Sequence, residues 1–181
     1  MAGFIERMVR AARLDVHLYE EVEADKTAMV QAMAVVVLSS IAAGVGSFGM
    51  GGITPGAILM GILASLAGWF LWAFLTYFIG TKLLPEPQTR TDYGELLRTI
   101  GFSSSPGIIR LLGVIPGLSG MLFWIAGVWM LVAMVIAVRQ ALDYQSTWRA
   151  VGVCAIGWII NTVILMAFFA FFSGAAPPPA G

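Results

Sequence analysis

YGELLRTIGFSSSPGIIRLLGV, residues 93–114, lies between long apolar runs, yet it contains two arginines, three consecutive serines and a Pro-Gly pair. The hydrocarbon core of a membrane tolerates such residues only where they face protein or water. As a continuous helix, this stretch would be about 33 Å long at ~1.5 Å per residue, enough to cross a bilayer. Whether it crosses decides the number and the direction of the spans that follow it.

The composition of the chain is that of a membrane protein. Hydrophobic residues make up 59% of the 181 residues and charged residues only 11%, whereas soluble domains are about a quarter charged. Ten basic residues balance ten acidic ones, so no nucleic-acid partner is predicted. The single cysteine, Cys154, excludes an internal disulfide and indicates a small buried side chain in an apolar run.

Residues 1–28 form a predicted cytoplasmic segment that begins with an amphipathic helix over residues 3–13. An apolar arc and a basic arc lie on opposite sides of this helix at about 100° per residue. The basic arc contains Arg7, Arg10 and Arg13, and residues 14–26 are mainly acidic. Two interpretations remain open. The helix lies on the anionic cytoplasmic lipid surface, or it packs on the cytoplasmic loops.

Four further apolar runs are long enough to cross a bilayer of about 30 Å. They are residues 29–47, 56–81, 121–141 and 150–172. With residues 93–114 as a short or kinked third span, the sequence predicts an all-α, polytopic membrane bundle of five helices over residues 29–173. The Pro/Ala/Gly-rich residues 174–181 are predicted to be a disordered tail.

Small residues at helical spacing predict close helix contacts within this bundle. One such face combines Gly61, Ser65 and Gly68, and another repeats alanine at positions 133, 137 and 141. Asn161 is the polar residue of the last run and predicts an interhelical hydrogen bond.

The distribution of basic residues favours five spans. If residues 93–114 cross, Arg110 alone lies outside and the other basic residues lie on the cytoplasmic side. If the stretch dips in and returns, Arg139 and Arg149 move outside and Arg110 moves inside. The positive-inside rule therefore favours a cytoplasmic N-terminus and an outside C-terminus, in the inner membrane of a cell. The re-entrant alternative stays open.

Pro106 predicts a kink or unwound turn near residues 103–107, because proline removes a backbone donor and clashes with the preceding turn. The serines beside it can satisfy the released backbone groups, or they can form a ligand site as broken helices do in transporters. Arg98 is predicted to pair with Glu95 or Asp143. The candidate interaction or polar-path residues are Arg98, Ser103, Ser104, Ser105, Pro106, Arg110, Arg139, Asp143 and Asn161.

Several segments together resemble the Yip1-domain family of membrane proteins in its bacterial form. They are residues 15–23 (DVHLYEEVE), 72–84 (WAFLTYFIGTKLL), 93–107 (YGELLRTIGFSSSPG) and 138–144 (VRQALDY), followed by Trp148-Arg-Ala. The resemblance implies five helices, a cytoplasmic N-terminus and a non-enzymatic role. The GTPase partners of eukaryotic members are not expected here, because the chain lacks their Asp-Leu-x-Gly-Pro-like motif.

The inventory of catalytic residues predicts that the chain is not an enzyme. No base lies near the serines at 103–105, because the single histidine, His17, is placed at the cytoplasmic edge. No metal site and no cofactor are predicted. The first hypothesis is a scaffold or accessory subunit that binds other membrane proteins or itself, or organises membrane lipids. The alternative is a small transporter, flippase-like protein or channel whose polar path, with Arg98, the serines and Arg110, favours an anionic solute or lipid.

Overall fold

A computed structural model describes residues 3–50 and 54–174 of the chain. All regular structure in these residues is helical. The elements are α1 (Phe4–Ala12), α2 (Val16–Ala24), α3 (Ala28–Gly46), η1 (Ser47–Met50), α4 (Pro55–Phe78), η2 (Ile79–Leu83), α5 (Tyr93–Phe102), η3 (Ser105–Val114), α6 (Ser119–Ala141) and α7 (Thr147–Gly174). Of the predicted tail, residues 175–181 lie outside the described residues.

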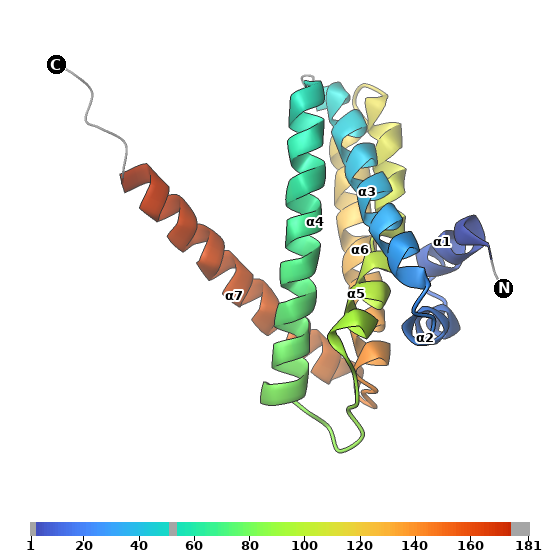
Figure 1. Cartoon of the computed structure of the whole chain (residues 1–181). Helices are drawn as coiled ribbons and strands as arrows, with labels where there is room; N and C mark the ends of the chain where they lie inside the picture. Colours follow the sequence, from blue (N-terminus) through green and yellow to red (C-terminus); the bar gives the residue numbers. More distant parts are fainter. Residues whose placement is uncertain (1–2, 51–53, 175–181) are drawn as a thin grey trace.

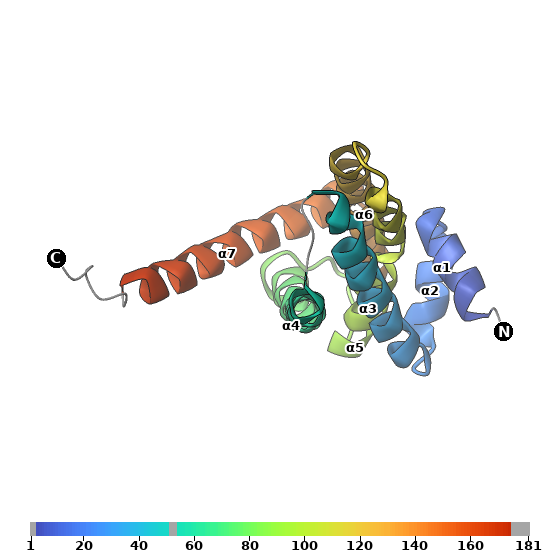
Figure 2. The ribbon, with the colours of Figure 1, turned by 90° about the horizontal axis from the view of Figure 1, so that it is seen from above.

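Four helices are long and apolar enough to cross a membrane, and they confirm the four apolar runs read from the sequence. They are Ala28–Gly46, Pro55–Leu83, Ser119–Ala141 and Thr147–Ile164 of α7. The chain is therefore a polytopic membrane bundle. The helix α4 runs beside α3, and α6 runs beside the third stretch, whereas α7 leaves the bundle at an angle (Figures 1 and 2).

The third stretch runs beside α3 from one end of that helix to the other (Figure 1). Gly94 lies against Met29 at the start of α3, and Gly113 lies against Gly46 at its end. The stretch is not one continuous helix. An α-helical half, α5, and a 3-10 half, η3, meet at Ser103 and Ser104, which confirms the predicted break.

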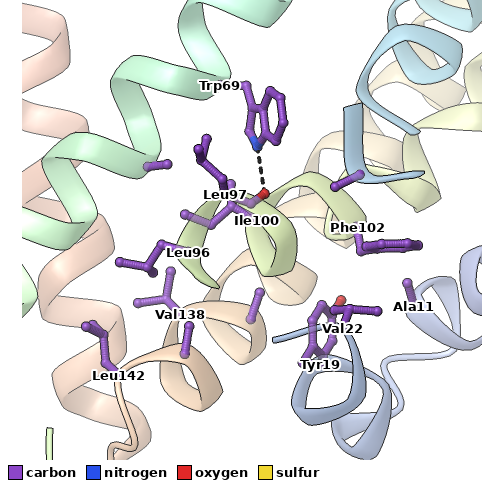
Figure 3. Close-up of a cluster of buried hydrophobic side chains, with 14 of the residues drawn as sticks. Ala11, Tyr19, Val22, Trp69, Leu96, Leu97, Ile100, Phe102, Val138 and Leu142 are labelled. Atoms are coloured by element: carbon purple, nitrogen blue, oxygen red, sulfur yellow. Dashed lines mark hydrogen bonds between the residues drawn. The ribbon is translucent and has the colours of Figure 1, made fainter. Parts of the chain in front are cut away.

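The helix α5 lies at the centre of the buried core. Asp92 begins it with a capping box, in which its side chain accepts from the Glu95 amide at 2.8 Å. Leu96, Ile100 and Phe102 are almost fully buried between α2, α4 and α6 (Figure 3). The Trp69 indole of α4 donates to the Leu97 carbonyl at 3.0 Å. Interior packing on every side explains how a helix of only ten residues keeps its place.

The basic face of α1 turns toward protein. Arg7 is only 3% exposed, and it donates to Glu21, Asp25 and Gln31 at 2.9, 2.8 and 3.1 Å. Arg10 likewise pairs with acidic side chains on α2 and just before it. Of the two interpretations of the amphipathic helix, packing on protein therefore describes the contacts of these two arginines.

Only some of the small-residue faces bring helices together. Ala133, Ala137 and Ala141 are fully buried, as predicted. The prediction for Gly61 and Gly68 is wrong, because a methyl group at either position would meet nothing within 4 Å. The buried residues of α4 are Trp69, Ala73, Leu75 and Thr76, and Gly68 lines an internal cavity instead of a helix contact.

Candidate functional site

The three serines at the break point in different directions, because successive helical residues are about 100° apart. The Ser103 hydroxyl donates to the Ile100 carbonyl of its own helix at 2.7 Å. Ser104 lines a cavity inside the bundle. Ser105 faces a groove beside α1, where its buried hydroxyl has no hydrogen-bond partner among the described residues. A single site made of all three serines is therefore excluded.

Pro106 lies in the first turn of η3. Backbone N–H groups in the first turn have no acceptor within their own helix, so a proline there costs no hydrogen bond. The residue is buried and lines the same groove as Ser105, between η3 and α1. Pro106 thus starts the 3-10 half of the third stretch and takes no part in the cavity.

Arg110 points back into the bundle from η3. Its Nε donates to the Gly107 carbonyl at 3.0 Å, and its Nη2 donates to the Ser39 hydroxyl at 2.7 Å. Ser39 lies seven residues before the end of α3, about 10 Å along a helix that rises ~1.5 Å per residue. The ring of Phe123 lies 5.8 Å from the guanidinium carbon. The charged group is thus held inside the bundle by neutral partners.

Gly107 makes this arrangement possible. A methyl group there would overlap the Ser39 hydroxyl and would lie 2.6 Å from Arg110 Nη2. Only a residue without a side chain lets η3 approach α3 closely enough for the arginine to reach Ser39. The Pro-Gly pair therefore has two separate roles, since the proline begins η3 and the glycine leaves space for the guanidinium.

The Arg110 side chain lines a cavity of about 320 Å³ between α3, α4, α6, α7 and the third stretch. Its polar lining consists of Ser39, Ser40, Ser65, Ser104, Arg110 and Asn161. Ser40 and Ser65 hydrogen-bond each other across α3 and α4 at 3.1 Å. These groups can all donate hydrogen bonds, and the described lining of the cavity includes no carboxylate. The site is therefore suited to an acceptor-rich, anionic group.

Two of the predicted site residues, Ser104 and Asn161, join Arg110 in this cavity. Asn161 lines the cavity from α7, and its predicted interhelical hydrogen bond stays a prediction. Sequence reasoning missed Ser39 and Ser40 altogether and treated Ser65 only as a small residue. The adjacent pair Ser39-Ser40 in an otherwise apolar span was the signal that could have found them.

Arg98 lies elsewhere, and its predicted pairing with Glu95 or Asp143 is wrong. Its Nε donates to the Val22 carbonyl at 2.9 Å, and its Nη2 donates to the Glu23 carbonyl. These carbonyls belong to the last turn of α2, which lacks internal donors and carries partial negative charge. Arg98 therefore caps α2 and does not line a path with Arg110.

Arg139 lies in the last turn of α6 and Asp143 just after it, and neither lines the Arg110 cavity, which α6 reaches with Met130 and Met134. Arg139 donates to the carbonyls of Tyr144 and Gln145, both at 3.2 Å. Asp143 is exposed, with a positive φ of 53° in the turn that precedes α7. Both residues line a shallow depression with Glu20 and Glu23 of α2, so they belong to the connection between helices.

Burial changes the acidity of Glu23 in this region. Desolvation, followed by the charges of Glu95 and Asp143, raises the pKa of Glu23 to about 7. The nearby Arg98 opposes this shift. Among residues 3–50 and 54–174, no group of three histidine, cysteine or acidic side chains is placed to hold a metal ion.

Comparison with known proteins gives one family. A family model described as the Yip1 domain matches residues 18–169, which include most of α2, all elements from α3 to α6, most of α7 and the described lining of the Arg110 cavity. The chain has no significant match among curated proteins or among solved structures. Since the match extends over most of the chain and its helices are those of a polytopic bundle, the protein belongs to the Yip1-domain family of non-enzymatic multi-pass membrane proteins.

Proposed function

We propose that the chain crosses the membrane five times, with its N-terminus in the cytoplasm and its C-terminus outside. The course of the third stretch supports this topology, because η3 ends beside Gly46 at the far end of α3. The basic residues support the same orientation, since the helix ends with Lys82, Arg139 and Arg149 and the loop with Arg90 then lie on the cytoplasmic side. The resemblance of its motifs to bacterial members favours the bacterial inner membrane.

We further propose that the protein is an accessory subunit that binds a transmembrane helix of another chain through α7. The observation that carries this proposal is the course of α7, which leaves the bundle (Figure 2). Ala150, Val153 and Cys154 in its first half are buried against its own bundle. Farther along, Ile159, Val163 and Met166 are 56, 59 and 65% exposed.

Packing explains why such a helix favours a partner. Lipid tails are as apolar as these side chains, so helix association in a membrane depends on van der Waals contact and interhelical hydrogen bonds. The far part of α7 gains little of either from its own chain. A helix of another subunit, including a second copy of this protein, would supply these contacts without rearranging the bundle.

Site-specific photocrosslinking in native membranes tests this proposal. A photoreactive amino acid at Ile159 or Val163 is expected to give a discrete protein adduct, whose mass identifies another protein or a second copy. Leu63 on α4 is 53% exposed and is the matched control on the bundle itself. Lipid adducts alone from Ile159 and Val163, with the same pattern as Leu63, would rule out helix binding by α7.

A transporter or flippase-like protein is the second candidate, and the cavity at Arg110 favours it. The polar path through the bundle is shorter than the sequence predicts. Arg98 binds a carbonyl at the end of α2 and therefore does not line this path. Flux of an anionic solute or lipid in liposomes should therefore depend on Arg110 and not on Arg98. Flux unchanged by Arg110→Ala would rule out this mechanism.

A further inference from the structure

Among the residues that the structure describes, Arg110 has no counter-ion inside the bundle. Three acceptors, the Gly107 carbonyl and the carbonyl and hydroxyl of Ser39, bind its Nε and Nη2. Within the described part of the chain, no carboxylate forms an ion pair with it and Nη1 has no hydrogen-bond acceptor. Charged groups inside a membrane protein are costly unless they are paired or solvated. The two N–H groups of Nη1 are therefore available to an anion.

Other donors line the same cavity. Trp72 forms part of its wall, and the buried indole N–H of this residue has no hydrogen-bond partner among the described residues. Ser104 and Asn161 contribute a hydroxyl and an amide. An arginine beside several neutral donors, with no acidic side chain among the lining residues, is the arrangement that recognises a phosphate or similar oxyanion.

An apolar crevice lies on the other side of Trp72. It has a volume of about 550 Å³ between α4, α6 and α7, and its lining includes Leu131, Val135, Cys154 and Trp158. Trp72 lines both spaces. A charged cavity and an apolar crevice on one shared wall match an amphiphile, which has a polar head and a hydrocarbon chain.

We propose that this pair of spaces binds a phosphate-bearing lipid, with its phosphate on Arg110 and an acyl chain in the crevice beyond Trp72. The site is separate from partner binding by the exposed part of α7, and it does not require that the lipid be transported. Arg110 is four residues from the end of η3, about 8 Å at the ~2 Å rise of a 3-10 helix. In the five-span topology, this depth is within reach of the outer headgroup layer.

Binding to the purified full chain in detergent tests the proposal, with native mass spectrometry for lipids and calorimetry for phosphate. The three probes are phosphatidic acid, diacylglycerol with the same chains, and inorganic phosphate. One phosphatidic acid should bind per chain, at least about tenfold more tightly than either other probe, because each of these lacks one half of the recognition. Equal binding of phosphatidic acid and diacylglycerol would overturn the role of Arg110. If inorganic phosphate binds as tightly as phosphatidic acid, the acyl chain adds nothing to the affinity. The proposal of a lipid ligand would then be wrong, and the cavity would be a site for a free anion.

Variants locate the site. Arg110→Gln should weaken phosphatidic acid binding by about tenfold or more, whereas the matched change Arg90→Gln, at an exposed position, should have no effect. Cys154→Phe narrows the crevice, so it should weaken the binding of phosphatidic acid and leave the affinity for inorganic phosphate unchanged. If Arg110→Gln does not fold, Ser104→Leu crowds the cavity while Arg110 stays, with the same loss expected. Undiminished lipid binding by a folded cavity variant would overturn the proposal, and crosslinking from Ile159 should be unaffected throughout.

Discussion

Arg98 Nε donates to the main-chain carbonyl of Val22 across 2.9 Å, so a buried cation of α5 holds the final turn of α2. The residues are far apart in the sequence, and together they join the N-terminal segment to the broken third stretch. This contact gives Arg98 a structural role. It also separates the two arginines of the third stretch, because Arg110 alone faces the internal cavity.

Removing the Arg98 contact should therefore destabilise the protein. Arg98→Ala leaves the carbonyls of Val22 and Glu23 without their donor, and we expect a loss of roughly 2–4 kcal/mol in unfolding free energy. Denaturant unfolding in detergent micelles measures it. The exposed Arg90→Ala is the control and should change stability by less than about 0.5 kcal/mol. Equal stability of the two variants would contradict the capping role of Arg98.

Acidification should release α1 from the bundle. Burial alone would raise the pKa of Glu21, but hydrogen bonds from Arg10 and Arg7 outweigh it, so this pKa is lowered. Hydrogen bonds from Thr27 and Arg7 lower the pKa of Asp25. A carboxylate whose pKa is lowered in the folded state stabilises the protein. This stabilisation is fully present above the ordinary pKa of about 4, and it is lost as the pH falls through the lowered pKa.

The rate at which pepsin, an acid protease, cleaves the N-terminal segment measures this release. The rate is followed from about pH 5 to about pH 2, a range that includes the titration of both carboxylates. Cleavage should increase steeply in the wild type below about pH 4. Arg7→Gln should be cleaved readily across the whole range, because it lacks the ion pairs from the start. A wild-type profile without pH dependence would show that these pairs do not hold α1.

Glu23 should produce the opposite pH dependence, in a different window. Since its folded pKa is raised to about 7, the folded state binds more protons than the unfolded state between about pH 4 and 7. Stability should therefore fall as the pH rises through this window. Glu23→Gln should remove the decline and raise the unfolding temperature at pH 8. A variant that loses stability at pH 8 would contradict the assigned environment of Glu23.

Glycine positions should differ sharply in their tolerance of a methyl group. At Gly46 the new atom would overlap the main-chain carbonyl of Arg110, so Gly46→Ala should cost about 1–3 kcal/mol through overpacking. At Gly68 nothing lies within 4 Å, so Gly68→Ala should be neutral or slightly stabilising. Thermal unfolding in the same detergent compares them. Similar unfolding temperatures for both variants would disprove the close approach of η3 to α3.

The sequence was a reliable guide wherever local chemistry decides the structure. Uninterrupted apolar runs can only be long helices in lipid, so the four long spans were predictable. The Ser-Ser-Ser-Pro-Gly run marked the break, because proline and glycine act on their own backbone. The Asp92 capping box likewise depends on residues only three positions apart.

The remaining features depend on which helices meet, which local patterns do not encode. Arg98 bonds main-chain carbonyls, and any residue in α2 could have offered these. The partner of Arg110 is Ser39, 71 residues away, so the composition of either span alone could not identify it. Asn161 of α7 and Gly68 of α4 line the same cavity, which the sequence of neither helix shows by itself. The family resemblance identified the chain, but it did not place these side chains.

The central claim is that the broken third stretch crosses the membrane and makes five spans. Reporter fusions at the two termini test it most directly, with an enzyme that is active only outside the cytoplasm. A fusion to the C-terminus should be active and a fusion to the N-terminus inactive, because an odd number of crossings places the termini on opposite sides. Inactive reporters at both termini would mean an even number of crossings and a third stretch that returns to the side from which it entered.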